Sequence, residues 1–347
     1  MSYSVESLRR FTEEVMCKAG LSAEESRIFT DSLISADMRG VSSHGLTRLS
    51  TYARRVEEGL VANHVEPEIV QDGGTVMRVD GKNGMGAYIG TRVMEMCIQR
   101  AKENGSSFAA VCGGNHFGCA SYFALQAARE GMIGFAVANG PAAIPPTGGT
   151  KPLLGTNPVA ISIPAGRYEP LVLDMATSAV ARGKVALAKK NGTSIPEGWG
   201  LDSKGRPTTD PAAVLDGGSM LPMGGAKGYG IALIVEILCS CMSGALNGQT
   251  LGSFYDFSRT QNAGYAFGAI DIGKILDLDL FKASVDSLFD SMKACPLAEG
   301  FSEIKIPGEI ENDKATKTEQ VGINLSDAVL ADLKNAAEHY GVAFPEE

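Results

Sequence analysis

The pattern that limits the fold most is an alternation of short β-type runs with helical segments, which begins after residue 72. Alternation of this kind predicts an α/β domain, in which helices cover the faces of a sheet. The Gly- and Pro-rich stretch 139–158 is expected to be a loop. The expected strands are 75–79, 108–111, 133–138, 159–163, 171–175 and 266–272, and the expected helices lie near 87–102, 121–129, 179–190, 229–244 and 279–293.

Helical patterns at both ends of the chain are expected to frame this α/β domain. Ser22 and Glu25 form a capping-box pattern, and Gly40 stops the helix that follows. A last helix is expected at 327–340. The predicted domains are an N-terminal helical domain over 1–72, completed by C-terminal helices of about 311–347, and an α/β domain over 73–310.

The charge balance argues against nucleic-acid or anionic-membrane partners. The chain has 31 Lys and Arg residues against 40 Asp and Glu residues, a formal net charge of −9, and no basic run that would bind phosphate groups. The most apolar stretch, 229–246, contains Glu236 and is expected to be a buried core helix rather than a membrane span.

The seven cysteines favour a reducing compartment. Their number is odd, no C-x-x-C pair is present, and most have apolar neighbours in the sequence. We therefore predict free, mostly buried thiols and a cytoplasmic protein. The first residues have neither a basic start nor an apolar run, so no signal peptide is expected.

The segment 84–90 is a test for a nucleotide-binding turn of the Rossmann type. Its glycines, Gly84, Gly86 and Gly90, follow a strand and open a helix, as such a turn requires. Their spacing is G-x-G-x-x-x-G, however, and the next strand ends at Cys112, where an acidic residue should hold the ribose. The sequence favours a plain helix start and does not support a Rossmann domain.

Two histidines stand among glycines. His44 is followed four residues later by Arg48, which would share its face of a helical turn. A histidine that exchanges a proton beside an arginine that clamps a carboxylate suits a 2-hydroxy or 2-keto acid. His116 lies in GGNHFG directly after a strand, where α/β sheets usually place ligands. A capping or turn-bonded histidine is the structural alternative for each, and His64 and His339 are expected to face solvent.

Four polar turns, three of which contain glycine, are further candidates for ligand binding, although each has a structural explanation as well. The last of them places Lys227 among glycines at the start of a long helix, which suits phosphate oxygens. None matches G-x-x-x-x-G-K-[ST], so a P-loop NTPase is excluded. The turns are 147–151, 155–158, 174–178 and 222–230.

Together these segments closely resemble the type 2 malate/L-lactate dehydrogenase family. This family includes ureidoglycolate, sulfolactate and diketogulonate oxidoreductases and some cyclic-imine reductases. The resemblance covers nearly the whole chain. The segments that carry it are ADMRGVSSHGLTRLSTYARRVEEG, GGNHFGCASYFALQAAREG, GTNPVAISIP, LDMATSAVARGKV, IPEGWGLDSKGRPTTDP, GGAKGYGIALIVEIL and IPGE.

The resemblance implies an oxidoreductase that uses NAD, with NADP left open, and no metal. It implies a non-Rossmann mixed-sheet core over 73–310 that binds cofactor and substrate, and a homodimer with active sites near the subunit interface. Gly140 departs from members with a serine there, which removes one hydroxyl contact, and Asn139 is a candidate to replace it. The cofactor-binding residues that the resemblance implies are Gly140, Asp174, Met175, Ala176, Lys227, Gly308, Glu309 and Ile310.

The working hypothesis is reversible hydride transfer between the nicotinamide and C2 of a small (S)-2-hydroxy acid of the malate, lactate, sulfolactate or ureidoglycolate type. Removing hydride requires loss of the hydroxyl proton, which neutral imidazole can accept near pH 7. In the family, the equivalent of His44 or of His116 carries the proton. We favour His116 as the base, His44 held by Ser43 as substrate partner or relay, and Arg48 as the carboxylate clamp.

This hypothesis predicts that oxidation slows below the histidine pKa. A flat profile from about pH 5 to 8 would indicate another base or a rate limited by a non-chemical step.

Four alternatives stay open. A reductase of cyclic imino acids would use the same groups but deliver hydride to C=N. A hydrolase based on Ser43 and His44 lacks a G-x-S-x-G elbow, and adjacent side chains seldom face one another. A metal site of His44, His116 and an acid lacks ligand spacing. A non-catalytic binding protein would retain both histidines, Arg48 and Lys227 without using them.

Overall fold

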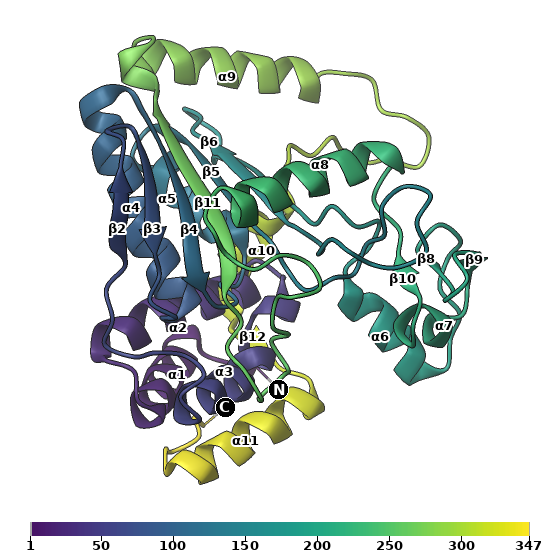
Figure 1. Ribbon diagram of the computed structural model, residues 1–347. Helices are drawn as coiled ribbons and strands as arrows, with labels where there is room; N and C mark the ends of the chain where they lie inside the picture. Colours follow the sequence, from purple (N-terminus) through teal and green to yellow (C-terminus); the bar gives the residue numbers. More distant parts are fainter. Residues whose placement is uncertain (1, 347) are drawn as a thin grey trace.

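The computed structural model describes residues 2–346 and has a seven-stranded mixed sheet at its centre (Figure 1). The strand order is β2-β3-β4-β11-β5-β6-β7, in which β3 and β4 run parallel and the other neighbouring pairs are antiparallel. Because a Rossmann sheet is mostly parallel, the predicted non-Rossmann α/β fold is confirmed. The strands are β2 (Glu68–Asp72), β3 (Val76–Asp80), β4 (Ser106–Gly114), β5 (Met132–Ala138), β6 (Val159–Ile163), β7 (Leu171–Met175) and β11 (Ala263–Asp271).

The central strand, β11, comes from a part of the chain far from both of its neighbours. Phe267 pairs with Ala109 on β4 and with Ala136 on β5. Phe267 belongs to the apolar cluster that includes α4 and α5, whereas the next-door Ala266 belongs to a second cluster with α8. Both faces of the strand are therefore covered, which explains its almost continuous apolar sequence. The helices are α4 (Gly86–Asn104), α5 (Ala120–Arg129) and α8 (Ala226–Glu236).

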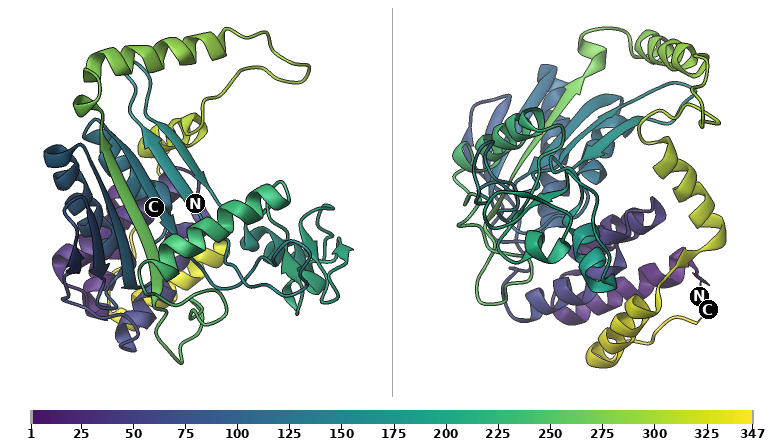
Figure 2. Two further views of the ribbon diagram at one scale, coloured as in Figure 1. Left: turned by 45° about the horizontal axis from the view of Figure 1, so that its top comes forward. Right: turned by 90° about the vertical axis from the view of Figure 1, so that its right-hand side faces the viewer.

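Helices from both chain ends pack together, and all but α10 lie below the sheet in the view of Figure 1. The helix α10 packs on α2 and rises beside the sheet, and Figure 2 shows the group from two further sides. The strands β1 (Ser2–Tyr3) and β12 (Ile323–Asn324) pair antiparallel and join these ends. The predicted capping box is confirmed, since the backbone N of Glu25 donates to Ser22 Oγ and Ser22 N donates to Glu25 Oε2. The helices are α1 (Val5–Ala19), α2 (Ala23–Met38), α3 (Leu49–Glu57), α10 (Glu309–Val321) and α11 (Asp327–Tyr340).

The sequence pattern predicted that the first 72 residues are helical, and this prediction is wrong in part. These residues also contain β1 and the edge strand β2. The residues of β2 are almost all exposed, so the strand lacks the apolar alternation by which a half-buried strand is recognised.

A small lobe lies beside the sheet, at the right of Figure 1, and has its own apolar cluster. Val185 and Val214 of the lobe pack there with Ile144 from the stretch 139–158. That stretch contains no helix or strand beyond one isolated bridge between Ile144 and Leu154, so the predicted loop is confirmed. The elements of the lobe are α6 (Arg182–Asn191), α7 (Pro211–Leu215), β8 (Gly200–Leu201), β9 (Pro207–Thr208) and β10 (Ser219–Met220), and α9 (Leu278–Lys293) crosses the opposite end of the sheet.

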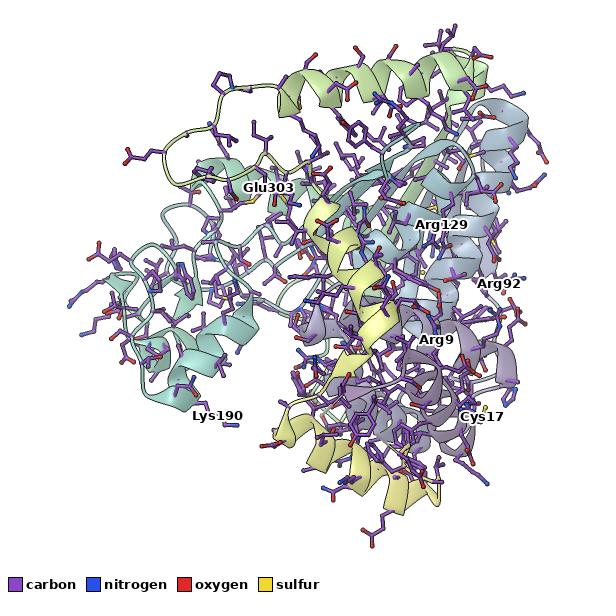
Figure 3. All side chains as sticks on the ribbon, turned by 180° about the vertical axis from the view of Figure 1, so that it is seen from behind. Arg9, Cys17, Arg92, Arg129, Lys190 and Glu303 are labelled. Carbon is purple, nitrogen blue, oxygen red and sulfur yellow. The ribbon has the colours of Figure 1, made fainter. Side chains whose placement is uncertain are left out.

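The seven cysteines are free thiols, but the prediction that most of them are buried is wrong. Cys97 and Cys239 are buried, whereas Cys17 is exposed on α1 (Figure 3). Met16, the neighbour of Cys17, is fully buried. Adjacent residues on a helix point in different directions, so an apolar neighbour does not imply burial.

The apolar stretch 229–246 is only partly buried, so its predicted role as a core helix is wrong for one face. It forms most of α8 and continues as a π-helical turn, Ile237–Cys241. Val235 and Cys239 are buried, but Ile234 is 58% exposed. Among residues 2–346, no helix has the length and apolar character needed to cross a membrane.

Candidate active site

A short irregular segment between α2 and α3 carries His44 and Arg48. It consists of two successive 3₁₀ turns that meet at Gly45. Asp37, in the last turn of α2, holds this segment, because its Oδ2 accepts a hydrogen bond from Leu46 N at 2.7 Å. Burial raises the pKa of Asp37 to about 6, against the lowering effect of that backbone bond. The position of both site residues therefore depends on one carboxylate.

Replacing Gly45 by alanine is expected to disturb this segment. A Cβ at Gly45 would lie 2.2 Å from the Asp37 carboxylate, which would have to leave its bond to Leu46. We expect a loss of about 1–3 kcal/mol in the free energy of unfolding, together with lower kcat/KM. Denaturant unfolding and steady-state kinetics measure the two effects. Gly183→Ala is the control, because a Cβ there meets no atom within 4 Å, and an equal loss in both variants would contradict the role of Asp37.

His116 lies in the loop that follows β4. Its backbone N donates to the buried Gln261 Oε1 at 2.8 Å. Its carbonyl packs against the start of α4, where a Cβ on Gly86 would lie 2.4 Å from the carbonyl oxygen. Likewise, a Cβ on Gly90 would lie 2.6 Å from the ring of Phe123. These glycines pack α4 closely against its surroundings, which agrees with the plain helix start that the sequence favours.

The structure brings the two imidazole rings together. The ring centroids of His44 and His116 are 5.6 Å apart, and the ring planes differ by 17°. Ser43 Oγ lies 2.9 Å from Nδ1 of His44, and the Tyr52 hydroxyl is hydrogen-bonded to Nδ1 of His116. Within residues 2–346, neither Nε2 has a hydrogen-bond partner, so each ring can present that nitrogen to a substrate.

The contact between Ser43 and His44 corrects one premise of the hydrolase alternative. These adjacent side chains do face one another, because the 3₁₀ turn brings the hydroxyl to the nearer ring nitrogen. Ser43 nevertheless lies on a turn between two helices and not on the strand-to-helix elbow of an α/β hydrolase.

Both imidazoles are neutral at pH 7. Burial, together with the nearby Arg48 guanidinium, lowers the pKa of His44 to about 4. Burial also lowers the pKa of His116 well below its usual value, with additional lowering by His44, Arg48 and Arg55. A neutral imidazole can accept a proton, so both rings are ready to act as a base in the free enzyme.

These pKa shifts move the expected pH dependence of oxidation to lower pH. A ring that loses its charge more readily stays neutral, and able to accept a proton, down to a pH near its lowered pKa. We therefore expect the histidines to cause no decline in kcat/KM for oxidation above about pH 5. This replaces the expectation of a decline below the ordinary histidine pKa. Asp37, whose pKa is raised to about 6, also titrates in this range, so the profile is measured in Asp37→Asn as well. A decline centred near pH 6.5 that persists in Asp37→Asn would contradict the expectation.

Arg48 lies beside the histidines, against two aromatic rings. Its Nε donates to the carbonyl of Ser43 at 2.7 Å. Its guanidinium carbon lies 6.0 Å from the ring centroid of Phe254 and 5.4 Å from that of Tyr255. The Phe254 ring also lies 4.9 Å from that of His116. This site thus combines proton acceptors, a cation suited to a carboxylate and two aromatic rings.

Sequence reasoning missed three residues that contact His116 in this site: Tyr52, Phe254 and Gln261. Tyr52 follows Arg48 by four residues and lies on the same face of α3, so helical spacing could have found it. Phe254 and Gln261 come from a segment far along the chain, and no local pattern connects that segment with α3.

Six of the residues predicted to bind the cofactor belong to the edge strand β7 or to the segment that packs against it. Asp174 Oδ2 accepts from Ser121 N at 2.9 Å, at the start of the helix that follows the His116 loop. Val172 N donates to Pro307 O at 2.9 Å, and a Cβ on Gly308 would lie 2.9 Å from the Val172 side chain. The six residues are Asp174, Met175 and Ala176 at the end of β7, and Gly308, Glu309 and Ile310 at the start of α10.

Three of the four polar turns converge beyond the end of β7. Thr177 N donates to Thr156 O at 2.8 Å, and Met223 N donates to Thr177 O at 2.9 Å. Gly140 N donates to Asn157 Oδ1 at 3.2 Å. The turns at 155–158, 174–178 and 222–230 therefore form one surface with the end of β5. The fourth turn lies elsewhere, since Thr150 packs against Gly205 of the lobe.

Two positions on this surface fit a nicotinamide cofactor. A Cβ on Gly140 would meet no atom within 4 Å, so the backbone there faces open space. Lys227 is exposed in the first turn of α8, where its amine and the helix N-terminus both suit phosphate oxygens. Asn139 does not replace the missing hydroxyl at Gly140, because its buried amide already bonds Glu236, Leu246 and Gly264.

The remaining candidates lie outside this surface. His64 and His339 are exposed, as predicted, and His339 is bonded to Glu57. In the part of the chain that the structure describes, no group of three or more His, Cys, Asp or Glu side chains is placed to hold a metal ion.

Comparison with known proteins gives a consistent result. The family model described as malate/L-lactate dehydrogenase matches residues 3–334. A malate dehydrogenase from Pyrococcus horikoshii is 36% identical over 341 residues, covering 96% of this chain and 93% of that protein. The NADP-dependent (2R)-3-sulfolactate dehydrogenase of Chromohalobacter salexigens is 38% identical, covering 91% and 92%. The NAD-dependent ureidoglycolate dehydrogenase of Escherichia coli K12 is 32% identical, covering 96% and 95%.

Solved structures show the same similarity. Malate dehydrogenase from Entamoeba histolytica has a TM-score of 0.95 at 31% identity and covers 100% of this chain and 99% of its own. Sulfolactate dehydrogenase from Methanocaldococcus jannaschii has a TM-score of 0.93 at 35% identity, covering 99% and 98%. A delta1-piperideine-2-carboxylate reductase from Pseudomonas syringae has a TM-score of 0.85 at 28% identity, covering 97% and 100%.

Proposed function

The chain belongs to the malate/L-lactate dehydrogenase family and is an oxidoreductase that acts on hydroxy acids with a nicotinamide cofactor, and from this premise we propose its reaction. It transfers hydride between C2 of a small (S)-2-hydroxy acid, of the malate, lactate, sulfolactate or ureidoglycolate type, and NAD, with NADP as the second candidate. The observation that carries this proposal is that the half-buried side chains of His44, His116 and Arg48 lie close together around the Phe254 ring.

Each of these residues has a proposed part in the oxidation of the alcohol. Arg48 binds the substrate carboxylate and so fixes C2 in position. Nε2 of His116 accepts the hydroxyl proton as C2–O becomes a carbonyl, while His44, held by Ser43, hydrogen-bonds the same oxygen or relays the proton. The bound nicotinamide supplies the acceptor for the hydride that leaves C2. In the reverse direction, the protonated imidazole returns its proton to the oxygen.

The cofactor is proposed to lie along β7 and the turns beyond it. Asp174, Met175 and Ala176 with Gly308, Glu309 and Ile310 would hold it at the strand, and Gly140 and Lys227 would lie beside it at the converged turns. The open space at Gly140 and the exposed amine of Lys227 support this placement.

We also propose a homodimer in the cytoplasm. The exposed apolar side chains of α8 and its π-turn, among them Ile234 and Ile237, offer a surface that a second copy would cover. The free thiols favour a reducing compartment. We further propose that 1–72 with 311–347 forms one domain and 73–310 the other, so that the site lies between them.

A reductase of cyclic imino acids is the second candidate, and the similarity to the piperideine-2-carboxylate reductase favours it. The test is a panel of one keto acid for each proposed type (oxaloacetate, pyruvate, sulfopyruvate and oxalurate) together with Δ1-piperideine-2-carboxylate. Each is assayed with NADH and NADPH and read by cofactor absorbance. The proposal expects faster reduction of a keto acid than of the imine. Faster reduction of the imine would establish the second candidate, and no turnover with any of them would contradict both.

A further inference from the structure

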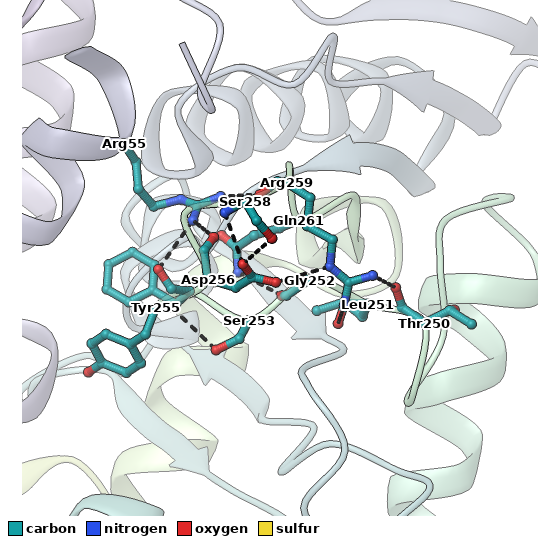
Figure 4. Close-up of polar contacts among 11 residues, drawn as sticks. Arg55, Thr250, Leu251, Gly252, Ser253, Tyr255, Asp256, Ser258, Arg259 and Gln261 are labelled. Carbon is teal, nitrogen blue, oxygen red and sulfur yellow. Dashed lines mark hydrogen bonds and ion pairs between the residues drawn. The ribbon is translucent and has the colours of Figure 1, made fainter. Parts of the chain in front are cut away.

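Arg55 is a fully buried arginine on α3, one turn beyond the residues of the proposed site. Within residues 2–346 it forms no ion pair with a carboxylate. Its guanidinium instead donates to three backbone carbonyls, those of Phe254 at 3.3 Å, Asp256 at 2.8 Å and Arg259 at 3.3 Å (Figure 4). Burying a cation without an anion is costly, so the three carbonyls are what holds it in place.

The segment that Arg55 binds is a compact loop, residues 252–261, which we call the Arg55 turn. Its ends are joined, because Gly252 N donates to Gln261 O at 3.2 Å and Gln261 Nε2 donates to Gly252 O at 3.3 Å. Inside the turn, Asp256 accepts from Ser258 N at 2.9 Å. The turn contains no regular helix or strand, so its shape depends on these bonds and on Arg55.

The same turn contacts the residues of the proposed active site. Phe254 contacts His116 and also Tyr52, with ring centroids 4.7 Å apart in the second pair. Gln261 Oε1 holds the backbone of His116. Tyr255 places its ring 5.4 Å from the Arg48 guanidinium and is 58% exposed, so it borders open space beside that cation.

We propose that Arg55 is a positioning residue that holds the Arg55 turn against His116 and Arg48. Tyr255, on this turn, then selects substrates by the substituent that they carry at C3. This inference rests on the proposed function, in which Arg48 binds the carboxylate. In a small 2-hydroxy acid, the C3 substituent is only three bonds from that carboxylate carbon. A ring beside Arg48 is therefore within reach of it.

The geometry explains why arginine is needed at this position. A guanidinium presents five N–H donors in a fixed planar fork, and here the fork reaches carbonyls from both ends of the turn. Lysine has a single ammonium that cannot span them. Both Arg55→Lys and Arg55→Met are expected to loosen the turn.

The first experiment measures the turn without using activity. Hydrogen exchange of the full-length protein is followed in Arg55→Met and Arg55→Lys, with Arg10→Met as the control, because Arg10 is 75% exposed on α1. We expect exchange in peptides that cover 252–261 to accelerate at least about tenfold, with β5 unchanged and no change in the control. Unchanged protection of 252–261 would overturn the role of Arg55, whatever reaction the protein catalyses.

The second experiment tests selectivity. The ratio of kcat/KM for oxaloacetate to that for pyruvate, two keto acids that differ in a C3 carboxylate, is measured in Tyr255→Ala and in Arg55→Met. We expect this ratio to change about fivefold or more in both, while the Kd of the cofactor changes less than twofold. An unchanged ratio in Tyr255→Ala would overturn the selection by Tyr255.

The two experiments separate the possible failures. If Arg55→Met loses protection throughout the protein, Tyr255→Ala decides, because an exposed side chain can be removed without loss of fold. If the wild-type protein reduces none of the keto acids of the proposed types, the proposed function fails on its own. The exchange experiment then still decides whether Arg55 holds the turn.

Discussion

Replacing His116 by alanine is expected to slow turnover about 10²- to 10⁴-fold, the range typical for loss of a general acid or base. The reason is that Nε2 of His116 is the proposed acceptor of the hydroxyl proton, while Tyr52 holds the opposite nitrogen. The measurement is kcat at saturating substrate and cofactor in both directions. The Kd of the cofactor should change little, because the ring is proposed to act on the alcohol.

Two further variants make this result interpretable. His339→Ala is the matched control, because this exposed histidine pairs with Glu57 at the surface, and such pairs contribute little. His44→Ala tests the other ring of the stacked pair. A loss of less than about tenfold in His116→Ala would count against the assignment of the base. A larger loss in His44→Ala at the same time would transfer that role to His44.

Replacing Arg48 by lysine is expected to raise KM for the hydroxy acid about ten- to a hundredfold. Lysine keeps the charge but loses the planar fork. It also loses the hydrogen bond from Nε to the Ser43 carbonyl, which orients the guanidinium beside the histidines. A carboxylate bound by a single flexible ammonium would hold C2 less firmly, so kcat should fall as well.

The comparison of two ligands gives this prediction its force. The Kd of the cofactor, measured by titration without substrate, should change less than twofold. Arg10→Lys is the control, because Arg10 is 75% exposed on α1 and pairs with Glu6 at the surface. Equal losses of substrate and cofactor binding in Arg48→Lys would contradict its role as a carboxylate clamp.

Local patterns in the sequence predicted a large part of the fold. The strands β6 and β7 were expected with the bounds that the structure has, because each is a short apolar run between loops. The end of α2 was expected as well, since Gly40 adopts a φ of 77° that few other residues tolerate. The two-domain division and the catalytic roles of the individual residues stay predictions.

The arrangement of the site could be predicted only where residues are close in sequence or carry a recognisable motif. His44 and Arg48 are four residues apart, and His116 is marked by its glycine-rich loop after a strand. Phe254 has no such mark, and its place beside His116 follows from the long-range path of the turn that Arg55 holds. The exposed face of α8 was missed for a related reason. An apolar residue in the sequence indicates a preference for burial, but it does not tell which surface, in the same chain or in another, covers it.

The insertion of β11 between β4 and β5 has a consequence for biosynthesis. While the ribosome is still making residues before 263, β4 and β5 have no strand between them, and each presents an open, apolar edge. Such edges pair readily with other chains. The central sheet can therefore close only late in translation, and the unfinished chain is the form that most needs a chaperone.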